Sequence, residues 1–121
     1  MTVKSEAAGP NGLTITSLPV DGVRVVTVQG EIDYHTGAVL RDALSPADDA
    51  AAPRTVIDLS GVTFMDSSGI DILIAAHQTA GVVGGRIRLA CPTESVLRTL
   101  QIVGLDQIIT CYPTLALALS D

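Results

Sequence analysis

Short segments with the pattern of β-strands alternate along this chain with segments whose apolar residues have helical spacing. The strand patterns cover residues 13–18, 23–29, 55–59, 86–90 and 108–112, and the helical patterns cover residues 36–44, 67–80, 94–103 and 114–119. Turn residues at 19–22 join the first two strands, which are expected to pair antiparallel. We therefore predict a single α/β domain with a mixed, mostly parallel sheet of about five strands, an antiparallel N-terminal edge and about four helices.

Glycine residues are expected to mark the ends of several of these elements. Gly30 and Gly61 follow strand patterns, and Gly81 and Gly104 follow helical ones. The segment 114–119 also alternates like a strand, but Thr114 can cap a helix there, which favours the helix.

The chain is long and apolar enough for one hydrophobic core, since 47% of its 121 residues are hydrophobic. We expect one domain over residues 1–121, in which the polar segment 1–12 is flexible. The segment 45–53 is rich in proline and alanine and is expected to be a surface loop. No apolar run has the length of a membrane span, and Asp71 interrupts one of them. The sequence thus predicts a soluble cytoplasmic protein that does not contact a membrane.

The composition argues against several classes of partner and cofactor. The formal net charge of −6 and the scattered basic residues argue against binding to nucleic acid. The chain has two tyrosines, one phenylalanine and no tryptophan, too few aromatic residues for a surface on which the bases of single-stranded nucleic acid could stack. Cys91 and Cys111 lack the spacing of a metal site, so no metal or cofactor is expected. Free thiols are favoured over a disulfide between them.

The segment Asp66-Ser67-Ser68-Gly69 stands where a strand-like apolar run ends and a helical pattern begins. We expect one of the two serine hydroxyls to cap this helix by accepting a hydrogen bond from a free amide. Capping needs only one hydroxyl, so the other is a candidate phosphoryl acceptor. A phosphate would add about −1.5 to −2 charges, which the helix dipole tolerates but Asp66 and Asp71 repel.

An enzymatic role for these serines has little support in the sequence. Neither a GxxxxGK[ST] loop nor a GxGxxG motif after a strand is present, and Met65 replaces the first glycine of a GxSxG elbow. A Ser-His-Asp triad would have to combine Ser67 and Asp33 with one of the two histidines. His77 lies on an apolar helical stripe, where a hydrogen-bonded boundary residue is expected, and His35 is expected to be a surface or capping residue. We therefore predict that the chain is not an enzyme.

Two motifs resemble those of STAS-domain anti-sigma factor antagonists, of the bacterial SpoIIAA and RsbV type. Residues 56–70 are similar to the phosphorylation segment of that family; they read Val-Ile-Asp-Leu-Ser-Gly-Val-Thr-Phe-Met-Asp-Ser-Ser-Gly-Ile. Gly30-Glu31-Ile32-Asp33 with Thr36 resembles its second signature, near the start of the first helix. The resemblance covers nearly the whole chain, because the expected order of elements also matches. Asp71 is a departure, since family members often have glycine there.

The resemblance implies a partner-switching cycle in transcription regulation, in the stress response or in sporulation. The unphosphorylated antagonist binds an anti-sigma factor that is also a serine kinase, and this binding frees a sigma factor. Phosphorylation ends the binding, and a serine phosphatase restores it. On this chain the phosphorylated residue would be Ser67, with Ser68 as the alternative. The implied partner-binding residues are Asp33, Thr36, Asp66, Ser67, Ser68, Gly69 and Asp71.

Two other functions are compatible with the serine motif. One is a STAS scaffold module in a stress-sensing complex or a lipid transporter, without a sigma factor partner. The other, which has less support, is an enzyme that uses Ser67 as a nucleophile.

Overall fold

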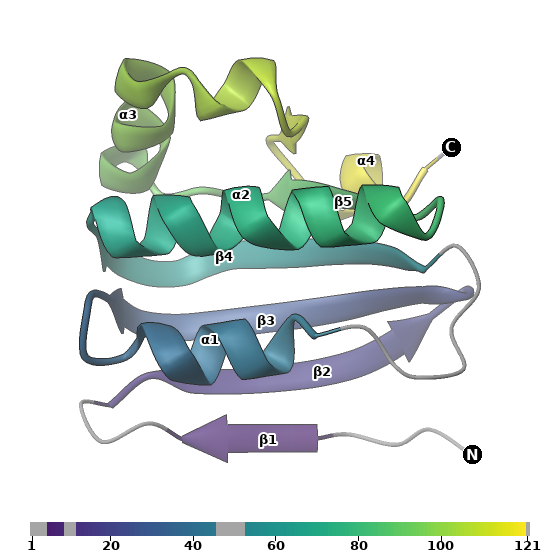
Figure 1. The fold of residues 1–121 in the computed structure, drawn as a ribbon, viewed down its shortest axis with the longest axis horizontal. Helices are drawn as coiled ribbons and strands as arrows, with labels where there is room; N and C mark the ends of the chain where they lie inside the picture. Colours follow the sequence, from purple (N-terminus) through teal and green to yellow (C-terminus); the bar gives the residue numbers. More distant parts are fainter. Residues whose placement is uncertain (1–4, 9–11, 46–52, 121) are drawn as a thin grey trace.

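The computed structural model describes residues 5–8, 12–45 and 53–120. Six strands in these segments form one sheet, in which the strands follow the order of the sequence (Figure 1). The strands are β1 (Ser5–Ala8), β2 (Thr14–Val20), β3 (Val23–Ile32), β4 (Arg54–Met65), β5 (Arg86–Ala90) and β6 (Cys111–Tyr112). Pairing is antiparallel from β1 to β3 and parallel from β3 to β6. The expected mixed sheet with an antiparallel N-terminal edge is confirmed.

Helices pack on both faces of the sheet. They are α1 (Gly37–Ala43), α2 (Ser67–Val82), α3 (Glu94–Val103), the 3-10 helix η1 (Leu105–Gln107) and α4 (Leu115–Leu119). Leu40 of α1, Leu73 of α2 and Leu100 of α3 join Ile57 of β4 in the main core. Ala118 of α4 belongs to a smaller, separate core. Figure 1 shows α1 and α2 in front of the strands. None of the helices in the described part of the chain is long and apolar enough to cross a membrane.

The sheet has one strand more than the sequence indicated. β1 lies within residues 1–12, where a flexible segment was expected, and pairs with β2. Its sequence, Ser-Glu-Ala-Ala, contains no β-branched residue, which is why the strand pattern did not reveal it. Residues 1–4 and 9–11 of the expected flexible segment lie outside the described residues. Residues 46–52 of the expected surface loop also lie outside them.

Strands β3 and β4 continue past the glycines that were expected to end them. β3 extends to Ile32 and β4 to Met65, with a shift of register after Gly30. A Cβ atom at Gly61 would lie 2.6 Å from Cγ of Gln29, so this glycine permits the close approach of the two strands. Because both strands continue, the two sequence motifs reach the same edge of the sheet.

Only the end of the segment 108–112 is a strand. A strand was expected over 108–112, but β6 contains only Cys111 and Tyr112. Ile109 is nevertheless buried in the main core, so its apolar side chain packs there from outside the strand. The helix favoured after Pro113 is confirmed as α4, where Thr114 Oγ1 accepts a hydrogen bond from Leu117 N at 3.1 Å.

The two cysteines are free thiols, as expected. Burial raises the pKa of the Cys111 thiol, and the neighbouring charges of Asp106 and Cys91 raise it further. Cys111 is therefore protonated at neutral pH and packs as a small apolar side chain against the main core.

Candidate functional site

Helix α2 begins at Ser67, directly after β4, and Asp66 is its N-cap residue. Asp66 has an extended backbone, and its Oδ1 accepts a hydrogen bond from Ser68 N at 2.8 Å. The expectation that a serine hydroxyl caps this helix was wrong, because a carboxylate does so. Ser67 is exposed at the first helical position, and Ser68 is half-buried. Both hydroxyls are therefore available for other roles.

The second motif forms a hydrogen-bonded loop between β3 and α1. Asp33 Oδ1 accepts hydrogen bonds from the backbone amides of His35 and Thr36, at 2.8 and 3.0 Å. Thr36 is fully buried, and its Oγ1 donates to Glu31 O and accepts from Asp33 N, both at 2.9 Å. These bonds fix the shape of the loop, so Thr36 supports the site from the interior.

The pKa of Asp33 lies below its ordinary value, and the largest cause is the hydrogen bond from the Thr36 amide. Desolvation opposes this shift, while the His35 amide and the Thr36 hydroxyl add to it. Since the folded-state pKa is lower than the unfolded-state pKa, ionised Asp33 stabilises the fold above the unfolded value of about 4. The contribution is lost as the pH falls through the lower, folded-state pKa.

We expect Asp33→Asn to make stability less dependent on pH in the acidic range. Urea denaturation midpoints of wild type and variant, measured from about pH 6 to about pH 2.5, would check this. The wild-type midpoint should fall more steeply than that of the variant below about pH 4. Parallel curves for the two proteins would contradict the assignment.

The two motifs meet where β3 and β4 end. Ile32 and Met65 are paired in register, and Asp66 N donates a hydrogen bond to Ile32 O at 3.1 Å. Gly69 is buried against the same two residues. A Cβ atom added at Gly69 would lie 2.6 Å from Met65 Cγ and 2.9 Å from Ile32 Cγ2. Gly69 thus allows α2 to begin close to the strand ends.

We expect Gly69→Ala to lower the free energy of unfolding by about 1–2 kcal/mol, because the added methyl group overpacks this junction. Gly81→Ala is the matched control in the same helix, since nothing lies within 4 Å of its Cβ. That control should be neutral or stabilising by up to about 1 kcal/mol, because alanine is the better helix former. Equal stability of the two variants in urea denaturation would show that Gly69 is not needed for close packing.

A polar hollow of about 570 Å³ lies between the starts of α1 and α2. Tyr34, His35 and Arg41 line it on one side, and Ser68 and Asp71 line it from α2. Tyr34 is 82% exposed, and its ring meets that of His35 edge-on, with the centroids 5.8 Å apart. The hollow therefore offers both donors and acceptors beside the serine motif.

Tyr34, Phe64 and Arg41 were not among the site residues expected from the sequence. Tyr34 and Phe64 are exposed and lie in the two motif segments. Because the chain has only three aromatic residues, their position in the motifs was a usable signal. Arg41 gave no such signal, since a helical pattern places it only on an exposed face.

The residues expected to bind a partner differ in how accessible they are. Ser67 and Asp71 are exposed, Asp33, Asp66 and Ser68 are half-buried, and Thr36 and Gly69 are buried. The accessible members all lie at the carboxyl ends of β3 and β4 or in the first turn and a half of α2. The two buried members hold that surface in place.

The structure does not assemble the catalytic triad that was considered from the sequence. Asp33 Oδ1 accepts hydrogen bonds from the backbone amides of His35 and Thr36, and among the described residues no hydrogen bond joins the Asp33 carboxylate to a histidine ring. His77 was expected to be hydrogen-bonded, but its Nδ1 is buried with no partner among the described residues. Within the same residues, no group of three or more histidine, cysteine or acidic side chains could hold a metal ion.

The comparison with known proteins identifies the family. The sequence model of the STAS domain matches residues 15–118, and the chain therefore belongs to the STAS domain family. Its relatives include the anti-sigma-F factor antagonist RsfB of Mycobacterium tuberculosis, 35% identical over 115 residues that cover 93% of this chain and 92% of the relative. The anti-sigma-B factor antagonist of Bacillus subtilis is 32% identical over 84 residues, which cover 69% of this chain and 76% of the relative.

A solved structure supports the same conclusion. The crystal structure of an anti-sigma factor antagonist from Mycobacterium paratuberculosis matches with a TM-score of 0.80 at 37% identity, covering 93% of this chain and 96% of that chain. The predicted α/β fold and the resemblance to STAS-domain anti-sigma factor antagonists are thus confirmed.

Proposed function

We propose that this chain is an anti-sigma factor antagonist that phosphorylation of Ser67 switches off. The unphosphorylated form binds an anti-sigma factor with serine kinase activity, and this binding releases a sigma factor. The observation that carries the proposal is the exposed Ser67 at the start of α2, whose hydroxyl is not needed for capping. The similarity to anti-sigma-F and anti-sigma-B factor antagonists supports the choice of partner.

The phosphorylation step requires only an accessible hydroxyl from this chain. Ser67 Oγ bonds to the γ-phosphorus of ATP, the bond from that phosphorus to the bridging oxygen breaks, and ADP leaves. The hydroxyl proton passes to a base of the kinase or to water. Phosphoryl transfer depends on positioning and charge stabilisation, which the kinase supplies together with Mg-ATP. This chain is thus the substrate and not the enzyme, and a serine phosphatase restores the hydroxyl by hydrolysis.

A phosphate on Ser67 changes the docking surface in both size and charge. It adds about −1.5 to −2 charges beside the carboxylates of Asp66 and Asp71. The N-terminus of α2 offsets part of that repulsion within the protein. A partner surface that fits the hydroxyl now meets a bulky anion for which it has no counter-charge, so binding weakens.

Intact-mass analysis after incubation with Mg-ATP tests the phosphorylation site. The protein is incubated with each anti-sigma factor with serine kinase activity that is encoded in the same genome. We expect one phosphate on wild type and on Ser68→Ala, and none on Ser67→Ala. If Ser67→Ala is fully phosphorylated and Ser68→Ala gains no phosphate, the phosphorylated residue is Ser68.

The proposal extends to the whole chain and its setting. Residues 1–121 form one STAS domain that acts in the bacterial cytoplasm, where transcription takes place. The family match over residues 15–118 supports this extent. Neither a metal nor a cofactor is required, since the kinase brings the nucleotide.

A further inference from the structure

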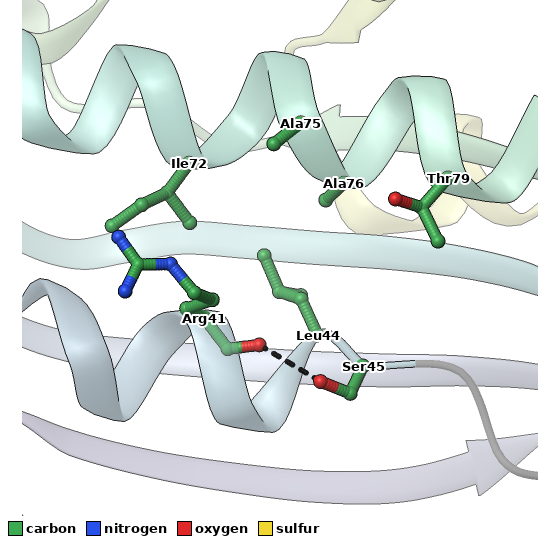
Figure 2. Close-up of a pocket in the computed structure, with 7 residues that line it drawn as sticks. All are labelled: Arg41, Leu44, Ser45, Ile72, Ala75, Ala76 and Thr79. Carbon is green, nitrogen blue, oxygen red and sulfur yellow. Dashed lines mark hydrogen bonds between the residues drawn. The ribbon is translucent and has the colours of Figure 1, made fainter.

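A second hollow, of about 200 Å³, lies between α1 and α2 (Figure 2). Leu44 projects into it from the end of α1, and Ile72, Ala75, Ala76 and Thr79 line it from α2. Beyond Ile72, the side chains on α2 that line the hollow are small. This open space between the helices is apolar along most of its length.

The two helices are in close contact at the start of this groove. A Cβ atom at Gly37 of α1 would lie 2.8 Å from Cδ1 of Ile72. Alanine side chains then leave the space into which Leu44 projects (Figure 2). The hollow therefore reflects the change in side-chain size along α2.

This apolar hollow adjoins the polar hollow beside the serine motif. Arg41 and Ile72 line both of them, and Figure 2 shows the Arg41 guanidinium extended toward Ile72. Together the two hollows extend along α2 from Ser68 to Thr79. At the rise of an α-helix this distance is about 16 Å, or three turns.

The size and chemistry of the groove favour a protein segment as its occupant. A volume of about 200 Å³ is below the roughly 300–1,000 Å³ of small-molecule pockets. An amphipathic helix that lies in a groove inserts apolar side chains spaced by three or four residues, and three turns suffice for this. Arg41 is exposed where the apolar and polar parts meet, so a carboxylate on the segment can pair with its guanidinium.

We propose that the groove between α1 and α2 binds an amphipathic helix of the anti-sigma factor, with an acidic side chain of that helix against Arg41. This inference rests on the proposed function and extends the docking surface beyond the serine motif. The same groove then contributes to the choice between different anti-sigma factors, because its apolar half must fit the partner's side chains.

Binding titrations of groove variants test the inference. Ala75→Glu places a charged side chain in the groove at an exposed helical position. Gln78→Glu adds the same charge to an exposed position of α2 outside the groove and is the matched control. The probes are the anti-sigma-F factor of Mycobacterium tuberculosis and the serine-kinase anti-sigma factors encoded with this chain. Calorimetry of the unphosphorylated proteins gives the dissociation constants.

We expect Ala75→Glu to weaken binding about tenfold or more, and Gln78→Glu to change it by less than about twofold. Arg41→Ala should weaken binding about threefold to tenfold. If Ala75→Glu does not fold, the uncharged Ala75→Gln fills the same space, and the same direction of change is expected.

The failure of this inference can be distinguished from failure of the proposed function. If wild type binds an anti-sigma factor and the groove variants bind it with the same dissociation constant, the groove is not part of the interface. The proposed function then stands. If wild type binds none of the anti-sigma factors, both proposals are wrong. Equal weakening by Ala75→Glu and Gln78→Glu would show a general charge effect and would also overturn the groove assignment.

Discussion

Phosphorylation of Ser67, or its replacement by glutamate, is expected to weaken binding to the anti-sigma factor at least about 100-fold, which corresponds to about 2.7 kcal/mol. The residue is exposed at the first position of α2, where a partner that covers the helix start must bury it. A buried charge without a counter-charge is destabilising by several kcal/mol, so even partial burial accounts for this loss. Calorimetric titration of the phosphorylated and unphosphorylated proteins measures the effect.

Two control variants separate the charge from the loss of the serine. Ser67→Ala should bind nearly as well as wild type and should stay bound in the presence of Mg-ATP, because it cannot be phosphorylated. Ser68→Glu should have a smaller effect than Ser67→Glu, because Ser68 is half-buried beside the Asp66 cap. Equal dissociation constants for phosphorylated and unphosphorylated wild type would refute the switch.

Thr36→Val is expected to lower the free energy of unfolding by about 2–3 kcal/mol, although valine has nearly the same shape. The buried hydroxyl of Thr36 donates to Glu31 O and accepts from Asp33 N. Valine leaves both backbone groups without this partner, and an unsatisfied buried group is destabilising by about 1–3 kcal/mol. Urea denaturation measures the change.

Thr36→Ser keeps the hydroxyl and is the matched control for this variant. It should retain more stability than Thr36→Val, since it loses only a methyl group, worth about 1 kcal/mol. The reverse order would show that packing of the methyl group, rather than the two hydrogen bonds, holds the loop.

The location of the site could be predicted from the sequence, but the identity of the capping residue could not. Aspartate and serine are almost equally good N-cap residues, and the chain offers Asp66, Ser67 and Ser68 in succession. The choice depends on where β4 ends, and the hydrogen bond from Asp66 N to Ile32 O marks that point. This contact joins residues that are far apart in the sequence, so no local pattern reveals it.

The fold was predictable wherever the apolar pattern was regular. The helical spacing in α2 and the β-branched run in β4 gave the correct element types. Glycine was the main source of error, because it marks strand ends and also close approaches between strands. Gly61 is of the second kind, since it allows Gln29 to pack against it.

The groove between α1 and α2 was not predictable, because it depends on how two helices pack. In the structure Ala75 is exposed, and both Ala75 and Ala76 line the groove. Arg41 likewise acquires its position beside Ile72 only through the packing of α1 against α2.

Transcription in vitro tests the proposed switch most directly. The assay contains core RNA polymerase, the sigma factor, its anti-sigma factor and a cognate promoter. Unphosphorylated protein should restore transcription that the anti-sigma factor has blocked, and protein phosphorylated on Ser67 should not. No restoration by saturating unphosphorylated protein, or equal restoration by both forms, would contradict the proposed switch.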